Sequence, residues 1–583
     1  MLAQAAISAG DTAWVLICAG LVLFMTPGLA FFYAGMVPKS NTLVMMQQNI
    51  IALGVVSITW VLLGYTIAFG DDAGGGLFGN LGLFGLLDIG TPPAPAFRVV
   101  AEGVTIPALA FVAYQMMFAV ITPALATGAT AGRLKFAGWA VFLAIWSIIV
   151  YPPIAHWLWH PGGWLAKLGT QDWAGGMVVH ASAGAAVLAL LLVVGRRRNW
   201  PHTNTLPNSV PLTIVGAGIL WFGWFGFNGG DGLQANGVAA QALINTHLAA
   251  AAGMLIWLLM ERVEDGHPTV VGAVSGAVAG LATITPCAGF VSTLSALAIG
   301  AIAGFVCHTA LRLKYLLRLD DALDVLAVHW VGGMLGSLLL GLFAQTQANK
   351  LSADGLFFGG GFRLLGNQVV GVLVVVVFSF VLSWLIATGI EKTIGLRAPV
   401  ANEGRLDQNQ QGIDAYHLDP VSSLPGGGSP TGGPGPQPTV GGTPVRPKPD
   451  QTRLVTGLLD SALVHSGDLR DALQAAGAVS IVVSEVHVST VPVHPQVVRG
   501  YRRDLELAGR IRVEALVPEA EVLAVLEVFD QLSPGHPEGF VQVAEASDDF
   551  RPGPGGGPPG AGGLPSGPGG GPQPGPQPGP RAS

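Results

Sequence analysis

Charged residues are scarce in this chain. Only 11% of its 583 residues are Asp, Glu, Lys or Arg, whereas 51% are hydrophobic, and the mean hydropathy is +0.55. Soluble domains carry about 25% charged residues, so the composition excludes a protein that is soluble throughout and predicts one that is largely embedded in a membrane. The scarcity is uneven, because residues 1–395 are nearly free of charge outside short loops and the remainder is Gly/Pro-rich or ordinarily charged. We therefore expect two parts in different solvents.

Cysteine is also rare. Cys18, Cys287 and Cys307 fall in apolar stretches without metal-ligand spacing, so we expect packing residues and neither a disulfide framework nor a metal site. The net charge of −7 is spread over both parts, and no nucleic-acid partner is expected. The charged part has no nucleophile–base pair and no metal cluster, so an enzyme is not expected and no cofactor is required.

Long apolar runs dominate the first 395 residues. A membrane-spanning helix needs about 20 apolar residues, and the segments that qualify are 13–35, 43–69, 104–128, 135–155, 174–195, 209–227, 237–260, 268–284, 289–310, 322–345 and 366–389. The initial MLAQAAISAG has no basic n-region, so the first run is expected to be retained. Lys and Arg crowd one set of loops, twelve against four, which predicts an outside N-terminus and a cytoplasmic C-terminus in a plasma-membrane protein.

A motif recurs in two of these helices. DWAGGMVVHASAG places Asp172 eight residues before His180, and DALDVLAVHWVGG places Asp321 eight residues before His329, each with a Gly pair close by. Five helices separate the two copies, so we predict two five-helix halves of inverted topology, as is common in transporters. The eleventh helix is left over and is expected to wrap the outside.

Ionisable residues at bilayer depth are costly and by default functional. A single intramembrane His is as often only a helix-to-helix hydrogen bond. Two in equivalent places favour function, because an inverted repeat brings both imidazoles to the midplane, where neutral rings share a proton. Asp172 at a helix start is instead expected to cap free amides, and Asp321 and Asp324 to shape the inner mouth.

Six stretches are similar, in order, to the Amt/Mep/Rh ammonium transporters: GDTAWVLICAGLVLFMTPGLAFFYAGMV, AYQMMFA, DWAGGMVVHASAG, WFGWFGFNGG, DDALDVLAVHWVGG and EGRLDQ with GIDAY. The resemblance covers the first 416 residues. It implies ammonium and ammonia as cargo, an eleven-helix transmembrane domain over 1–395, a homotrimer with one pore per subunit, and a cytoplasmic tail over 396–416 that couples subunits.

The resemblance also implies roles for individual residues. It places the phenyl gate on Phe118 and Phe227, an outer cation–π residue on Trp159, a pore-wall ring on Trp224, and the twin histidines on His180 and His329. Two positions depart from the family pattern. Asp231 stands where a serine is common, so a carboxylate would attract ammonium more strongly, trap it or accept its proton; Tyr114, four residues before Phe118, is expected to turn its hydroxyl to the vestibule.

Two functions follow from these residues. In the first, ammonium binds outside, loses a proton, and ammonia crosses an apolar pore while the proton passes along the histidines. In the second, the chain is an ammonium sensor that transports little, which Asp231 and a fused regulatory domain favour.

The remainder divides into a Gly/Pro-rich linker at 417–451, an ordered region at 452–549 and a low-complexity tail at 550–583, expected to be disordered. Apolar alternation in the ordered region predicts a small α+β domain of ferredoxin-like βαββαβ order. RLVTGLL, DLRDALQAAGA and RIRVEALVPE resemble PII signal-transduction proteins, which implies an adenine nucleotide and docking onto the transporter.

This region departs from the PII pattern at two places. Val498 replaces the tyrosine that is modified before Arg-Gly, and the phosphate turn SPGHPEG has His536 as its only cation, between Gly535 and Gly539. Weak or altered nucleotide binding is expected. Arg499, Arg502 and Arg503 are candidates to contact an acidic inner vestibule, although basic loop residues are more often simply solvated.

Overall fold

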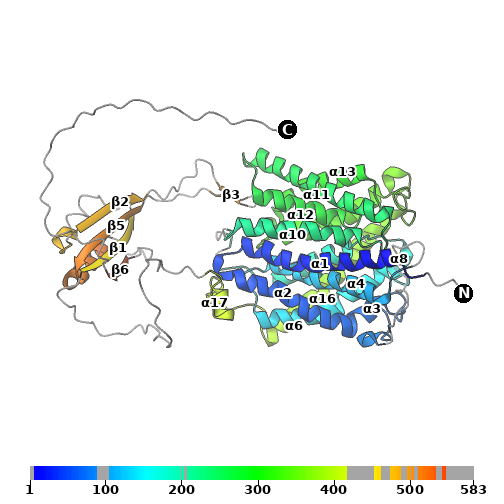
Figure 1. The fold of residues 1–583 in the computed structure, drawn as a ribbon, viewed down its shortest axis with the longest axis horizontal. Helices are drawn as coiled ribbons and strands as arrows, with labels where there is room; N and C mark the ends of the chain where they lie inside the picture. Colours follow the sequence, from blue (N-terminus) through cyan, green and yellow to red (C-terminus); the bar gives the residue numbers. More distant parts are fainter. Residues whose placement is uncertain are drawn as a thin grey trace, which may run out of the picture. The chain divides into compact units, whose positions relative to one another are not determined.

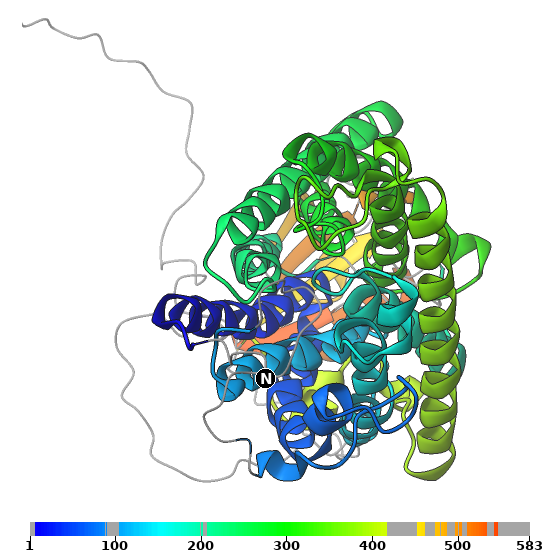
Figure 2. The ribbon, with the colours of Figure 1, turned by 90° about the vertical axis from the view of Figure 1, so that its right-hand side faces the viewer.

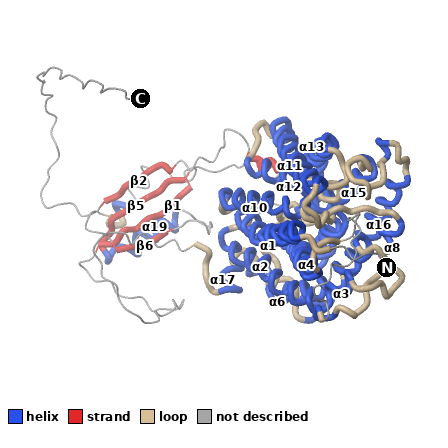
Figure 3. The backbone as a smooth tube through the Cα atoms, turned by 45° about the vertical axis from the view of Figure 1, so that its right-hand side comes forward, coloured by secondary structure: helices blue, strands red, loops and turns tan. Residues whose placement is uncertain are grey.

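The protein forms two compact units, Met1–Gly428 with Val497–Arg502, and Ser429–Gln496 with Arg503–Ser583. The computed structural model describes residues 6–87, 89, 104–198, 200–201, 207–416, 452–460, 473–478, 480–486, 496–498, 501–503, 510–532 and 541–545. Helices make up nearly all of the first unit, and the second contains a sheet (Figure 3). Each unit is described by itself.

Long helices run side by side through the first unit (Figure 1). They are α1 (Ala9–Met36), α2 (Thr42–Thr59) with η2 (Trp60–Gly64) and α3 (Tyr65–Phe69), α4 (Ala108–Ala124), α5 (Ala126–Ala129), α6 (Phe136–Ile149), α7 (Tyr151–Trp159), α8 (Trp164–Leu168), η4 (Gly176–Ala181) with α9 (Ser182–Val194), α10 (Val210–Gly229), α11 (Gly237–Glu264), α12 (Val270–Ile284), α13 (Thr293–Ala310), α14 (Leu313–Leu316), η5 (Leu326–Val331) with α15 (Gly332–Phe343), α16 (Arg363–Thr393) and α17 (Leu406–Gln411). Short 3₁₀ turns lie at Lys39–Asn41, Phe84–Leu86, Leu356–Phe358, Val400–Asn402 and, in the second unit, Glu519–Glu521.

The membrane-spanning character of this unit is confirmed. Among the described residues, ten helical segments are long and apolar enough to cross a bilayer. Helix α12, which corresponds to the predicted span 268–284, is apolar but has only 15 residues, so the count of eleven spans stays a prediction. Helix α16 has 31 residues and lies along one edge of the bundle when the helices are viewed end-on (Figure 2).

Polar caps set the beginnings of several helices. The Ser8 hydroxyl accepts from Asp11 N at the start of α1, and the Asn236 side chain accepts from the N–H groups of Val238 and Ala239 at the start of α11. These bonds satisfy amides that have no partner within the helix. The predicted span 135–155 is divided at Val150, because Pro152 and Pro153 follow in the first turn of α7 and cannot donate a backbone bond.

The three cysteines are packing residues, as predicted. Cys18, Cys287 and Cys307 are each 0% exposed and form no disulfide. All three belong to one continuous apolar core that runs through the helical unit.

The segment after α16 docks on the helical unit. Asp407 of α17 accepts from Leu43 N at 3.0 Å and Val44 N at 2.8 Å, at the beginning of α2. Leu406 packs against Val44 and Ala398 in a small apolar cluster. The tail is therefore fixed to α2 of the same chain by a carboxylate at a helix N-terminus.

A four-stranded antiparallel sheet organises the second unit. Strands β1 (Thr452–Asp460), β2 (Ser480–Val486), β5 (Arg510–Pro518) and β6 (Val541–Glu545) lie in the order β2-β5-β1-β6. Val455 of β1 stands opposite Ala515 of β5 and Val543 of β6. Helix α19 (Val522–Leu532) contributes Val525 to a core with Val455 and Ala515. Strands β3 (Gln496–Val498) and β4 (Tyr501–Arg503) form a separate pair inside the segment predicted as a loop.

Candidate functional site

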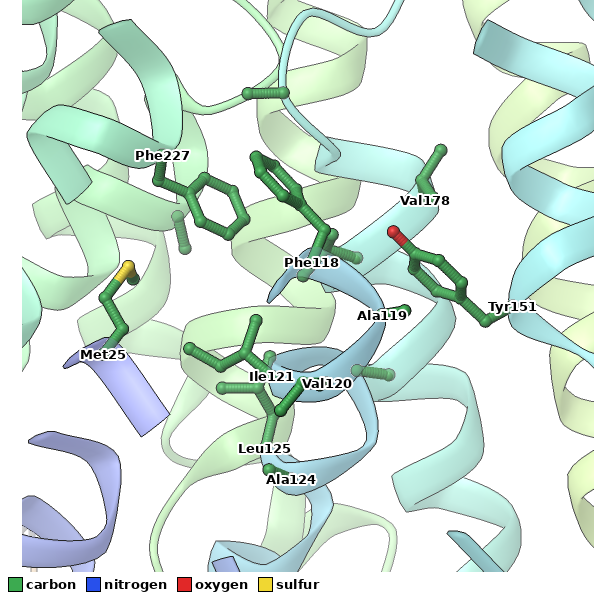
Figure 4. Close-up of a cluster of buried hydrophobic side chains, with 14 of the residues drawn as sticks. Met25, Phe118, Ala119, Val120, Ile121, Ala124, Leu125, Tyr151, Val178 and Phe227 are labelled. Carbon is green, nitrogen blue, oxygen red and sulfur yellow. The ribbon is translucent and has the colours of Figure 1, made fainter. Parts of the chain in front are cut away.

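Two phenyl rings close against each other in the interior of the helical unit. Phe118 of α4 and Phe227 of α10 stack with ring centroids 4.1 Å apart and planes at 28°. Figure 4 shows them facing each other from opposite helices. Trp159, at the end of α7, stands edge-on to Phe118 at 6.0 Å, and its Nε1 donates to Asp172 O. Sequence reasoning therefore named three aromatic residues that the fold brings together.

The two motif histidines meet. His180 and His329 lie with Nδ1 atoms 3.2 Å apart, so one ring donates a hydrogen bond to the other. Their ring planes lie at 22° with centroids 5.3 Å apart, so the rings face each other through their Nδ1 edges, and the Trp224 ring packs against His180 at 5.6 Å and 21°. Both histidines are buried. The pair is thus held by burial, by the contact with Trp224 and by the hydrogen bond between the two rings.

Each histidine stands in a π-helical turn, which the sequence did not reveal. His180 belongs to η4 and His329 to η5, both six residues long. A π-turn adds a residue to the helical repeat and is frequent at functional sites. The close crossing also needs glycine four residues after each histidine. A Cβ on Gly333 would lie 2.6 Å from His180 Cβ, and one on Gly184 would collide with Trp330.

A narrow cavity adjoins the histidines and Phe227. Its volume is about 10 Å³, which is room for a single water-sized molecule. It is lined by His180, His329 and Trp224 and otherwise by apolar side chains: Met25, Leu29, Phe32, Ile121, Leu125, Val179, Leu220, Phe227 and Val278. A hydrated ion does not fit such a space, whereas a small neutral molecule does.

Asp172 caps the helix that carries His180. Its carboxylate accepts from four backbone N–H groups, those of Gly175, Gly176, Met177 and Val178, at 2.6 to 3.1 Å. The arrangement is the one expected for a carboxylate at a helix start. Asp172 therefore sets the position of η4, and through η4 that of His180.

We expect Asp172→Ala to lower the stability of the protein by about 3 kcal/mol, because four buried amides lose a charged acceptor. Asp172→Asn retains one carbonyl oxygen and the side-chain shape, so its loss should be about 1 kcal/mol. Thermal unfolding of the purified full chain, followed by loss of the monodisperse fraction, measures both. Equal losses in the two variants would contradict a capping role.

The second motif is capped in the same way. Asp321 accepts from Val325 N at 3.1 Å and Leu326 N at 2.7 Å. Asp324 forms a buried ion pair with Lys314. Both carboxylates thus stand immediately before η5; that they shape an inner mouth stays a prediction.

An adjacent ion-pair network had no signal in the sequence. Asp320 accepts from Arg197 Nε at 2.9 Å and Nη2 at 2.6 Å, and Arg133 Nη1 lies 3.4 Å from Asp320 Oδ2. Arg133 and Asp320 are both buried. Residues 123 and 187 positions apart form this network, which is why local spacing does not predict it.

Tyr114 corrects one expectation. Its hydroxyl does not turn to a vestibule but donates to the carbonyl oxygens of Gly226 and Phe227, at 3.0 and 2.8 Å. Its ring stands edge-on to Phe118 with centroids 4.9 Å apart. Tyr114 therefore joins α4 to the last turns of α10 beside the phenyl pair.

Asp231 follows α10 and lies close to these groups. Its side chain is fully buried, and neither carboxylate oxygen has a hydrogen-bond partner in the part of the chain that the structure describes. Burial, and then the charge of Asp172, raise the pKa of Asp231 well above its usual range. The sequence identified this residue, but not that its carboxyl group has no donor.

The candidate residues of the region predicted to be PII-like are only partly described. Arg502 and Arg503 lie in β4. Arg499, Gly535, His536 and Gly539 lie outside the described residues, so the predicted nucleotide turn stays a prediction.

The fold and this site define a class: a multi-helix membrane protein in which two buried histidines and one ring of a stacked phenyl pair border a narrow apolar cavity. The model of the Ammonium Transporter Family matches residues 13–416, and the chain belongs to that family. An ammonium transporter of Mycobacterium bovis is 47% identical over 433 residues, which cover 70% of this chain and 89% of the relative.

Solved structures of related proteins have the same fold as the helical part of this chain. The crystal structure of the N240A mutant of Candida albicans Mep2 superposes with a TM-score of 0.63 and 33% identity, over 68% of this chain and 88% of that one. A structure described as a sensor Amt protein gives a TM-score of 0.62 and 30% identity, over 69% and 98%. The chain is thus similar both to transporters and to a protein named as a sensor.

Proposed function

We propose that the protein moves ammonium across a membrane by conducting ammonia through the apolar cavity and a proton along the histidine pair. The observation that carries the proposal is the 3.2 Å contact between the Nδ1 atoms of His180 and His329 beside a cavity of molecular width. The single polar path through an otherwise apolar lining suits a proton, and the space suits a small neutral molecule.

Recruitment takes place beside the phenyl pair. The faces of Trp159, Phe118 and Phe227 attract a small cation, each contact being worth about 0.5–2 kcal/mol. Asp231 adds a buried carboxyl group nearby. Sodium and potassium cannot lose their charge by giving up a proton, so the apolar cavity excludes them while ammonia passes.

Charge movement tests this function. Proteoliposomes that contain the full chain receive a pulse of ammonium, and the current is recorded with sodium and potassium pulses as controls. We expect a sustained, ammonium-selective current. The sensor function is favoured instead if the native chain gives only a brief binding transient while Asp231→Ser gives a sustained current.

The phenyl pair should control selectivity. We expect Phe227→Ala to admit water and hydrated cations, so that potassium carries a current comparable to that of ammonium. Phe222→Ala is the matched control, because Phe222 is on the same helix but is 55% exposed and should leave selectivity unchanged. If Phe227→Ala still discriminated against potassium as well as the native chain does, the Phe227 ring would not act as a selectivity gate.

The proposed function also implies an oligomeric state and a membrane topology for this chain. We propose a homotrimer with an outside N-terminus, eleven spans that include the short α12, and two inverted five-helix halves. The matching positions of η4 and η5 support the inverted halves. The β2-β5-β1-β6 order is that of a ferredoxin-like sheet and supports a PII-like regulatory domain with an adenine nucleotide as its ligand class.

A further inference from the structure

Asp231 has an environment unlike that of the other carboxylates in the site. Asp172 accepts four backbone bonds and Asp321 accepts two. The two oxygens of Asp231 accept none among the described residues, although the side chain is 0% exposed. An ionised carboxylate without donors in an apolar interior is strongly disfavoured, because it loses its hydration and gains no compensating hydrogen bonds. The empty site therefore favours a neutral carboxylic acid.

Among the residues that the structure describes, the titratable groups that act on Asp231 carry no positive charge. They are Tyr114 from α4, Tyr151 from α7 and the carboxylate of Asp172, with Cys18 of α1 against the neighbouring Gly230. The charge of Asp172 acts in the same direction as burial, against ionisation of Asp231. A positive charge must consequently come from a ligand.

Several buried oxygens near Asp231 have no hydrogen-bond donor among the described residues. The Tyr114 hydroxyl is already bonded to two carbonyl oxygens. Asn228, three residues before Asp231, donates from Nδ2 to Thr246, and its buried Oδ1 has no partner among the described residues. The Tyr151 hydroxyl is buried without a partner as well and points toward the side of Phe118 (Figure 4). A ligand with several N–H donors and one positive charge satisfies this set.

We propose that ammonium binds at Asp231 in exchange for the carboxyl proton. This inference rests on the proposed function of the outer site and specifies its chemistry. The O–H bond of the Asp231 carboxyl group breaks, the oxygen keeps the electron pair, and the proton leaves to the outer solution. Ammonium then faces the carboxylate with all four N–H bonds intact, so the site is neutral both when empty and when occupied.

The exchange makes ammonium and protons competitors. Where Asp231 is protonated in the empty site, the apparent affinity for ammonium falls about tenfold for each unit by which the pH is lowered. The maximal current at saturating ammonium is unaffected, because the competition is then overcome. A hydroxyl in place of Asp231 has no proton to release and gives an affinity that does not change with pH.

The experiment is calorimetric titration of ammonium chloride into the purified full chain between about pH 5 and pH 8, in buffers of different ionisation enthalpy, which reports the protons released. The variants are Asp231→Asn, which keeps the shape, and Asp231→Ser. Asp71→Asn is the matched control, because Asp71 is an exposed carboxylate on a loop. We expect about one proton released per ammonium in the native chain and in Asp71→Asn, and none in the Asp231 variants.

Three results would overturn the exchange: binding without proton release, an affinity that is flat with pH, or the same pH dependence in Asp231→Asn. The native chain alone decides the first two, so a variant that folds poorly leaves the test intact. Failure of the proposed function, conduction of ammonium, would show in the current and not in the binding data. Proton-coupled binding without sustained current would support the exchange and reject conduction, whereas a current with a pH-independent affinity would do the reverse.

Discussion

His180→Ala should abolish the sustained ammonium current or make it unselective. The substitution removes one partner of the 3.2 Å Nδ1–Nδ1 contact, and the remaining imidazole faces a widened apolar cavity without a second nitrogen. A positioned proton-transfer group contributes about 10²- to 10⁴-fold to a rate, so we expect the current to fall at least about 100-fold. Solid-supported membrane recordings on proteoliposomes with matched protein content measure this.

The controls separate proton transfer from packing. His247→Ala removes a histidine that packs against Trp221 and Phe225 away from the cavity, and it should keep the native current. His329→Ala should match His180→Ala, and the double variant should be no worse than either, because residues that act as a unit are non-additive. A native current in His180→Ala would show that protons take another path.

Asp320→Ala should destabilise the protein by about 3–5 kcal/mol, the range for breaking a buried ion pair from one side. Arg133 is fully buried, and its loss of Asp320 leaves an uncompensated guanidinium among backbone carbonyls. Burial opposes ionisation of Asp320, but the hydrogen bond from Arg197 and the charges of Arg133 and Arg197 outweigh it, and the pKa of Asp320 is lowered. This stabilisation is therefore present above the ordinary Asp pKa of about 3.9 and is lost as the pH falls through the folded-state pKa.

Thermal inactivation of the full chain is the measurement, compared between neutral pH and about pH 2.5, which lies below the ordinary Asp pKa, where the difference between the native chain and Asp320→Ala should shrink. The matched control is Glu264→Ala, which breaks the exposed Arg312–Glu264 pair at 2.9 Å and should change stability by less than about 1 kcal/mol. An equally small loss of stability in both variants would contradict this prediction. It would mean that the hydrogen bonds from Arg133 to the carbonyl oxygens of Ala129 and Gly195 are sufficient to stabilise the buried guanidinium.

The histidine pair could be predicted because it depends on a local pattern. An eight-residue spacing from a capping carboxylate to a histidine occurs twice, and the two histidines come into contact in the fold. The π-turns could not be predicted, since GMVVHA and LAVHWV are apolar on nearly every side and no hydrophobic period marks an extra residue. The resemblance to ammonium transporters added the aromatic residues, which by composition alone are ordinary packing residues.

Other features depend on contacts that no local pattern encodes. The sequence predicts a vestibule position for the Tyr114 hydroxyl. In the fold, this hydroxyl donates instead to carbonyl oxygens of residues 112 and 113 positions away in the chain. The Arg133–Asp320 pair and the bonds from Leu43 and Val44 to Asp407 likewise join distant segments. Residue type indicated that these groups are polar, and only the tertiary fold determines their partners.

The cysteines have a practical consequence. Because Cys18, Cys287 and Cys307 are wholly enclosed in the apolar core, maleimide reagents added to the folded protein should find no native thiol. A fluorophore placed on one introduced cysteine in α17 and another in α19 would then report, by energy transfer, how the two units move relative to each other when ammonium is added. The chain needs no cysteine-free background for such work.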